Sequence, residues 1–188
     1  MERCKKVDKS WIGEVLGFWF VERTPENWFQ KNWVVDQMIR DRFLWVHERL
    51  SQQVPPDALG TKDGALAALV VLDQFSRNLF RGSAKAFTAD PLALSIAKLA
   101  IDRGYDRRLH PDKRQFVYLP FEHSEDGKEQ ERSMHLFGEM GVPDNVHYAW
   151  LHKVIIDRFG RFPHRNVALG RTSTPEEIAF LNGPNSSF

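Results

Sequence analysis

The sequence has little cysteine and no long apolar run. Cys4 is the only cysteine among 188 residues, which excludes an intrachain disulfide and a cysteine-rich zinc site and suits a reducing compartment. The longest apolar run, Ala65 to Leu72, is far shorter than the roughly 20 residues that span a bilayer. The basic first residues are not followed by the apolar segment of a secretory signal. We therefore expect a soluble cytoplasmic protein with no membrane partner.

An excess of charge of one sign is also lacking. The 26 Lys and Arg residues balance the 25 Asp and Glu residues, which leaves a net charge of +1. No global field then draws the protein onto nucleic acid, and any electrostatic recognition must be local. The basic run over residues 103–114 is interrupted by Asp102, Asp106 and Asp112, so we interpret it as a solvated face. No nucleic-acid partner is predicted.

Neither strand-like alternation nor a fixed-period repeat occurs along the chain. A length of 188 residues favours one core, and 42% hydrophobic residues, with 12% aromatic residues, supply the apolar area for it. We predict an all-α fold in a single domain over residues 1–188, with frayed tails at 1–9 and 184–188. About eight helices are expected, stacked as antiparallel hairpins because the connections are short.

Helical periodicity and helix-end signals locate the elements. Asp36 is expected to cap one helix, and the segment from Lys62 to Phe80 is apolar all round at its centre, which is typical of a buried helix. Asp90 before Pro91 predicts another N-cap. Pro120 is expected to end a helix at Leu119 and to leave residues 121–124 on an irregular corner.

Two later segments have the pattern of a capping box, in which a cap residue and a glutamate three positions on bind each other's backbone. One is Asp126 with Glu129, and the other is Thr174 with Glu177, where Pro175 also favours a helix start. Both patterns predict helix starts in the last third of the chain.

Three polar blocks interrupt the apolar pattern. The first is Asp73-Gln74 with Arg77-Asn78, where an acid and a base four residues apart continue an apolar helix face. The second is Glu122-His123-Ser124-Glu125, and the third is the loop over residues 159–166, which is crowded with arginine. We expect Asp73 and Arg77 to form a buried pair, and Gln74 and Asn78 to bond neighbouring backbone. If the blocks meet, they form a mixed-charge pocket.

These blocks resemble a known family. Leu72 to Asn78, Leu119 to Asp126 and Phe159 to Asn166 look like the three signature blocks of the bacterial family called domain of unknown function 924. The likeness extends from Val15 to the Thr174 box, although the family usually has proline where this chain has Ser76. The resemblance implies an all-helical fold similar to tetratricopeptide-like superhelices. It implies no established activity, so function must be argued from the site.

The first hypothesis is a site for a small anionic ligand or a peptide carboxylate. Arginine offers a planar fork that matches carboxylate and phosphate, and amides and imidazoles can fix the orientation of the ligand. An alternative is that the arginines only pair with Glu122, Glu125 and Asp73 and so tie the helices together. The predicted ligand-binding residues are Asp73, Arg77, Asn78, His152, Arg161, His164, Arg165 and Asn166.

The second hypothesis is a hydrolase or lyase in the same pocket. His123 beside Glu122 or Glu125 can act as a general base, with His152 or His164 as its counterpart. No cofactor is predicted and no metal ligand is assigned, because the spacing matches no metal-binding signature, although two histidines and a carboxylate leave a divalent metal as an alternative. A third hypothesis is a protein-interaction scaffold, which needs no polar cleft. The oligomeric state is not predicted.

Overall fold

The computed structural model describes residues 10–186. The tail predicted at 1–9 lies outside these residues, as do positions 187–188 of the tail predicted at 184–188. Residues 184 and 185 form a turn after the last helix, and the Ser186 hydroxyl donates to the Leu181 carbonyl at 3.1 Å. The helical segments in chain order are α1 (Ser10–Gly17), η1 (Phe18–Glu22), α2 (Pro25–Trp28), α3 (Trp33–Gln52), α4 (Lys62–Leu69), η2 (Val70–Phe75), α5 (Ser76–Leu79), η3 (Ala84–Phe87), α6 (Asp90–Asp102), η4 (Asp106–Arg108), α7 (Pro111–Glu122), α8 (Gly127–Met140), α9 (Pro143–Phe159), η5 (Pro163–Arg165) and α10 (Pro175–Leu181).

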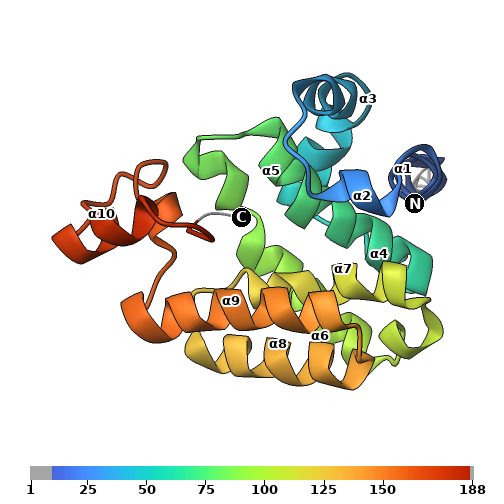
Figure 1. The fold of residues 1–188 in the computed structure, drawn as a ribbon. Coiled ribbons are helices and arrows are strands. Elements are labelled where there is room, and N and C mark those ends of the chain that lie inside the picture. Colours follow the sequence, from blue (N-terminus) through green and yellow to red (C-terminus); the bar gives the residue numbers. More distant parts are fainter. Residues whose placement is uncertain (1–9, 187–188) are drawn as a thin grey trace.

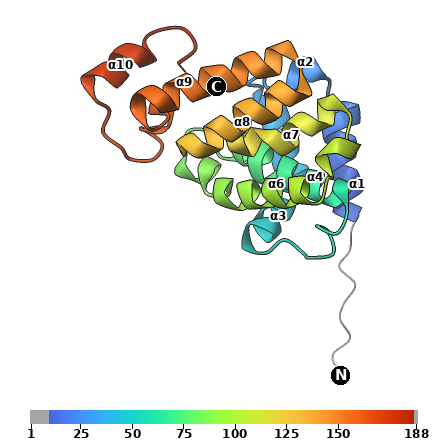
Figure 2. The ribbon, with the colours of Figure 1, turned by 90° about the horizontal axis from the view of Figure 1, so that it is seen from below.

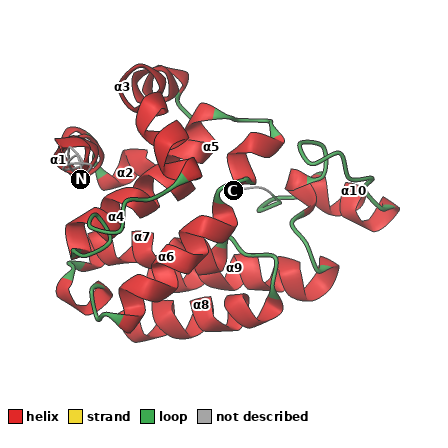
Figure 3. Cartoon of the chain, turned by 180° about the vertical axis from the view of Figure 1, so that it is seen from behind, coloured by secondary structure: helices red, strands yellow, loops and turns green. Residues whose placement is uncertain are grey.

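The all-α fold predicted from the sequence is confirmed. Helices joined by loops make up residues 10–186, and that range contains no strand (Figure 3). The tetratricopeptide-like superhelix implied by the family resemblance stays a prediction. No helix within the same range is long and apolar enough to cross a membrane.

The core is built around α4 and its continuation η2. Every residue from Ala65 to Leu72 is at most 1% exposed, as the apolar pattern predicted. The helix α4 packs on α1, α6 and α7, and η2 packs on α3. Aromatic rings from three segments close around this axis, with Phe18, Phe43 and Phe75 within 6.0 Å of one another between ring centroids. The central helix is therefore held on several sides at once.

The C-terminal half forms a succession of packed helices. α6 packs on α7, α7 on α8 and α8 on α9, while α10 packs on η5. Figures 1 and 2 show α10 at one end of the molecule, beyond the end of α9 and far from α1. The polar blocks lie where η2, the end of α7 and the loop after α9 approach one another.

The helix predicted from Lys62 to Phe80 is one helical stretch, but its middle is a π-helix over Val70–Phe75. The wider turn follows directly after the apolar centre, and the Ser76 hydroxyl donates to the Leu72 carbonyl at 2.6 Å across it. Short π segments inside α-helices often occur at functional sites. Here the π segment carries Asp73 and Gln74.

The prediction that Pro120 ends its helix is wrong. α7 continues to Glu122, and the His123 amide still donates to the Leu119 carbonyl at 2.8 Å. Proline within a helix costs about 3 kcal/mol through a lost hydrogen bond and a clash. Every residue of α7 from Gln115 to Glu122 is buried, and this packing offsets that cost. Glu122 and His123 therefore end a helix rather than occupy an irregular corner.

Two cap predictions are also wrong. Asn32 caps α3 by accepting from the Val34 and Val35 amides, whereas Asp36 lies in the first turn and binds Arg81 instead. Asp90 is the first residue of α6 and makes no cap bond, because its carboxylate is taken by arginines from other segments. A local rule was overridden in each case by a charged partner distant in sequence.

The two capping boxes have different outcomes. Thr174 and Glu177 form the predicted box, with the Thr174 amide donating to Glu177 Oε2 at 2.7 Å and the Glu177 amide donating to Thr174 Oγ1 at 3.2 Å. Asp126 caps α8 through the Lys128 amide, but Glu129 pairs with Lys98. Only the box of Thr174 and Glu177 is complete.

Candidate functional site

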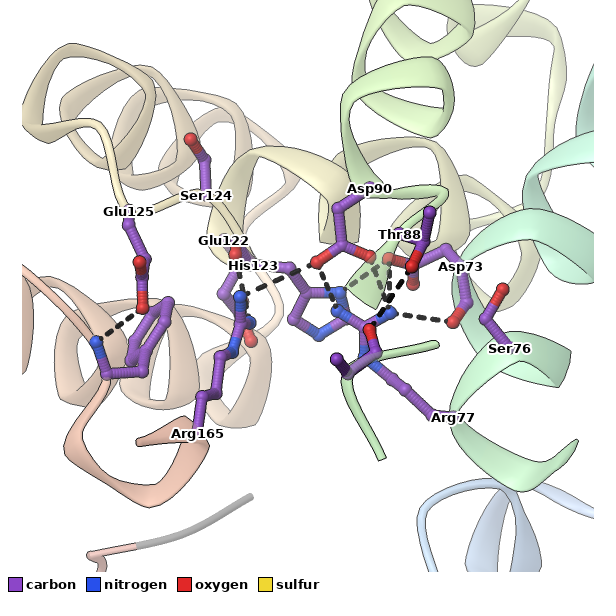
Figure 4. Close-up of polar contacts among 12 residues, drawn as sticks. Asp73, Ser76, Arg77, Thr88, Asp90, Glu122, His123, Ser124, Glu125 and Arg165 are labelled. Atoms are coloured by element: carbon purple, nitrogen blue, oxygen red, sulfur yellow. Dashed lines mark hydrogen bonds and ion pairs between the residues drawn. The ribbon is translucent and has the colours of Figure 1, made fainter. Parts of the chain in front are cut away.

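The centre of the site is a hydrogen bond between the first and second polar blocks. η2 carries Asp73 and the end of α7 carries His123, and Asp73 Oδ1 lies 2.7 Å from His123 Nδ1 (Figure 4). Gln74 donates to the other oxygen of Asp73 at 2.6 Å, so the prediction that it would bond backbone is wrong. Asp73 is 1% exposed. Because a carboxylate only accepts, His123 presents its proton on Nδ1 and its lone pair on Nε2.

Arg77 and Asp90 form the next layer. Arg77 lies 3.3 Å from Asp73 Oδ1, which agrees with the predicted pair, and it also donates to the Asp73 carbonyl at 2.8 Å. Its shorter side-chain bonds reach both oxygens of Asp90, at 3.0 and 3.1 Å. Asp90 is the site residue that sequence reasoning missed, because an aspartate before proline is the ordinary pattern of an N-cap.

Arg165 enters from the loop after α9. Its Nη2 donates to the His123 carbonyl at 3.0 Å, and its Nη1 reaches Asp90 Oδ2 only at 3.5 Å. The guanidinium lies between two aromatic rings, 4.6 Å from the centre of Phe87 and 4.5 Å from that of Phe162. Its buried Nε has no hydrogen-bond partner among the described residues. Two arginines thus share one carboxylate.

Glu122 and His152 complete the group from α7 and α9. His152 Nδ1 donates to the Tyr148 carbonyl at 2.9 Å and lies 3.1 Å from Glu122 Oε1. The rings of His123 and His152 are 6.0 Å apart between centroids, and Phe162 packs edge-on against His152. We call the whole group the His123 cluster; its members are Asp73, Arg77, Asp90, Glu122, His123, His152 and Arg165.

Burial disfavours charge in part of this cluster. Burial, with the charge of Asp73 nearby, raises the pKa of Glu122 to about 8. Burial also lowers the pKa of His123, aided by Arg77, and lowers that of His152 well below its usual value. Although burial alone would raise the pKa of Asp73, the charge of Arg77 and the hydrogen bond from His123 outweigh it and lower that pKa.

Burial also lowers the pKa values of two residues in the loop after α9, Arg165 and His164. Burial and the nearby charge of Arg77 lower the pKa of Arg165 to about 10. Burial and Arg165 lower the pKa of His164 to about 3. Perturbed groups of this kind gather at functional sites, although structural networks also produce them.

Arg161 and Asn166 of the third block belong to a separate group near α10, together with Glu125, Arg171 and Glu177. Arg161 binds Glu177 through two bonds of 2.7 and 2.8 Å, and Arg171 binds Glu125 through two bonds of 2.7 and 3.0 Å. Asn166 donates to Glu177 Oε2 at 3.3 Å. We call these five residues the C-terminal clamp. Each of its arginines has a carboxylate of its own.

The structure therefore divides the predicted site residues. It brings together Asp73, Arg77, Glu122, His123, His152 and Arg165, and the ring of His164 lies 5.6 Å from that of Phe162 at the edge of this group. Arg161, Asn166 and Glu125 belong to the clamp. The pairing of Arg171 with Glu125 agrees with the alternative that arginines tie helices together, whereas Arg161 pairs with Glu177 instead of the predicted carboxylates. Asn78 donates to Asp36 at 2.7 Å, so its predicted backbone bond is wrong.

Two surface hollows lie away from the His123 cluster. One, of about 140 Å³, is lined by residues of α6 and α8 that include Lys98 and Arg132, together with Phe121 of α7. Another, of about 190 Å³, lies between Trp28 and His110. Neither contains a residue of the His123 cluster, and we derive the candidate site from its chemistry.

Comparison with known proteins gives the family. The chain is similar to a solved structure of a protein of unknown function from Agrobacterium tumefaciens, with 40% identity and a TM-score of 0.87 over 91% of this chain and 96% of that one. No curated protein matches it. The family model described as "Bacterial protein of unknown function (DUF924)" matches residues 15–185. The chain belongs to this bacterial family, as its three polar blocks indicated.

Proposed function

We propose that the His123 cluster binds a small anionic ligand, with Arg165 as the main contact and with Arg77 and His123 beside it. The ligand would carry a carboxylate or phosphate group, or be the C-terminal carboxylate of a peptide. The observation that carries the proposal is the incomplete pairing of Arg165, which is 6% exposed. A buried charge is costly unless it is paired and hydrogen-bonded.

The count of partners supports this proposal. Asp90 gives its two shorter bonds to Arg77, so the 3.5 Å approach of Arg165 is the weaker contact. Arg165 keeps a buried Nε with no partner among residues 10–186, and the fall of its pKa to about 10 has burial and Arg77 as its main causes. An oxyanion beside Nε would supply both an acceptor and a negative charge.

A second candidate function is acid–base catalysis on the bound anion. The specific observation is the 2.7 Å bond from His123 Nδ1 to Asp73, which fixes the ring and its tautomer in the way that an aspartate orients a catalytic histidine. His123 is only partly buried, so its Nε2 can face a ligand. In this function His123 is the proton acceptor of a hydrolase or lyase reaction.

Melting-temperature shifts test the binding proposal. Inorganic phosphate, acetate and a short peptide with a free or amidated C-terminus are titrated at constant ionic strength. At 100 times its dissociation constant a ligand adds about 2.7 kcal/mol of stability, so saturable binding is measurable. We expect at least one of these oxyanions to stabilise the wild type, with the amidated peptide as the inactive arm.

Variants then locate the binding. Arg165→Met should lose the ligand-induced shift, and Arg165→Lys should keep part of it because the charge remains. Arg161→Met is the matched control from the C-terminal clamp; it is expected to change the starting melting temperature and to keep the shift. An equal shift in Arg165→Met and the wild type would contradict the proposal.

A further inference from the structure

We infer that Glu122, His123 and His152 form a binding site for a divalent transition-metal ion such as Zn²⁺. One donor atom from each residue can be chosen so that all three lie within 4.8 Å of one another. The site shares His123 with the proposed anion site but uses neither Arg165 nor Asp90, so the inference does not rest on anion binding. The bound ion would link the end of α7, which carries Glu122, to α9, which carries His152.

The hydrogen bonds around the two histidines favour metal binding. Histidines that bind a metal usually donate their other ring N–H to a carboxylate or a backbone carbonyl, which fixes the tautomer and aims the lone pair. His123 donates from Nδ1 to the Asp73 carboxylate at 2.7 Å. His152 directs Nδ1 to the Tyr148 carbonyl at 2.9 Å. The two common kinds of partner are therefore both present, one on each ring.

The donor set indicates which ions fit. Two imidazoles and one carboxylate suit Zn²⁺, Fe²⁺, Mn²⁺ or Co²⁺, whereas Mg²⁺ and Ca²⁺ prefer oxygen ligands and Cu⁺ prefers sulfur. Three protein ligands leave at least one position for water or another ligand, which is the pattern of catalytic rather than structural zinc sites. Such an ion would bind the ring of His123, and the backbone carbonyl of the same residue accepts a hydrogen bond from Arg165.

The approach of the three side chains is close to what an ion needs. Ligand atoms at about 2.0–2.2 Å from a metal lie roughly 3–3.5 Å from one another. Glu122 Oε1 lies 3.1 Å from His152 Nδ1, and both side chains are almost fully buried. Because Nδ1 donates to the Tyr148 carbonyl, the ion would bind the same ring through Nε2. His123, at the end of α7, is only partly buried. The open side of the site is therefore the side of His123.

Calorimetric titration tests the inference with the metal alone. The protein is stripped with a chelator and titrated with Zn²⁺ in a buffer free of phosphate and carboxylates. We expect one ion per chain for the wild type. Loss of a residue that only hydrogen-bonds to a metal ligand lowers metal affinity by about 10–100-fold. Glu122→Gln removes a ligand itself, so it should weaken binding by more than that. The amide keeps the shape of Glu122 and can still accept a hydrogen bond from His152.

Two controls make the result specific. His135→Ala removes an exposed histidine that lies 3.3 Å from Glu139, so it matches the His–Glu pairing without the buried cluster, and it should bind like the wild type. Arg165→Met should also keep the metal, which separates this inference from the anion proposal. Absence of stoichiometric binding, or equal affinity in Glu122→Gln and the wild type, would overturn the inference.

A measurement on the wild type guards against a variant that does not fold. One equivalent of Co²⁺ is added to the metal-free protein, and its visible absorption is recorded. Intense bands from a cobalt ion held by two nitrogens and an oxygen at low coordination number are expected. A spectrum equal to that of hydrated Co²⁺ would show that the three side chains do not bind it, and the inference would fail.

Discussion

The His123 cluster and the C-terminal clamp are built from the same residue types but differ in how the charges are matched. In the clamp, Arg161 and Arg171 each hold one carboxylate through two bonds. In the cluster, Arg77 and Arg165 share Asp90, and Glu122 has no arginine partner in the interactions that the structure describes. The density of arginine in the sequence is therefore no guide to the site, whereas the matching of charges is.

The three glutamates show this difference in their pKa values. Hydrogen bonds from Arg161 and the Thr174 amide lower the pKa of Glu177 to about 2. Burial opposes ionisation of Glu125, yet Arg171 and the Phe162 amide lower its pKa. Burial and Asp73 raise that of Glu122 to about 8. The clamp stabilises the charges it holds, and the cluster holds groups whose charge it disfavours.

Asp73→Ala should have the largest effect. Removing one partner of a buried pair leaves the other charge uncompensated, so we expect a loss of about 3–5 kcal/mol in the free energy of unfolding. Arg77, His123 and Gln74 would all lose an acceptor at once. Urea denaturation measures the loss. A loss of less than about 1 kcal/mol would show that Asp73 lies in an open, solvated pocket. The cluster would then not differ from the clamp in the burial of its charges.

Arg171→Met and Arg165→Met compare the two regions directly. Loss of the two-bond pair with Glu125 should cost about 1.5–3 kcal/mol, the range for hydrogen bonds to charged groups. Arg165→Met should be close to neutral or stabilising, because methionine fits between Phe87 and Phe162 and Asp90 keeps Arg77. Both arginines have a buried Nε without a hydrogen-bond partner among residues 10–186. The unpaired Nε therefore does not explain a difference in stability between the two variants. Equal losses would mean that Arg165 is as well matched as Arg171.

Acid should remove the contribution of the clamp. The pKa of Glu177 in the folded protein, about 2, lies below its ordinary value of 4.5, so its charge adds stability above about pH 4.5 that is lost as the pH falls toward 2. The stability difference between the wild type and Glu177→Gln should therefore be constant near neutral pH and shrink below about pH 4.5. A difference that stays the same down to about pH 3 would contradict the ion pair as its source.

Among the destabilising changes, Thr174→Ala should have the smallest effect. It removes the side-chain half of the capping box of α10 and should cost about 1 kcal/mol. Thr172, whose carbonyl accepts from Arg161, offers a matched control because Thr172→Ala keeps that backbone oxygen. Thermal melts of the two variants at neutral pH provide the comparison. Equal melting temperatures would show that the clamp, and not the cap, positions α10.

Periodicity predicted the all-α fold and the buried segment from Ala65 to Leu72, because a helix that is apolar all round has few alternatives to burial. The spacing of four also predicted the pair of Asp73 and Arg77. Local signals failed where packing or a remote charge competed with them. Pro120 lies inside α7 because its neighbours are buried, and Asp90 faces arginines rather than capping its helix.

The partner of each arginine could not be predicted. Arginines at positions 161, 165 and 171 are similar in sequence context, yet they bind Glu177, Asp90 and Glu125 from three different segments. The sequence shows which residues carry a charge, but which residue of opposite charge lies beside each of them depends on how the helices pack together. The structure therefore brings together His123, Asp73 and Arg77 of the predicted pocket, and it places Arg161 and Glu125 in a different group of charges.

The most direct test of the central claim is the position of a small oxyanion bound to the protein. Crystals soaked with selenate, an oxyanion whose selenium scatters anomalously, would show that position without any variant. We predict a selenium peak next to Arg165, placed so that a selenate oxygen can accept a hydrogen bond from Arg165, beside His123 and Asp90. Selenate bound only at Arg161 or Arg171, with none at Arg165, would contradict the assignment of the site to the His123 cluster.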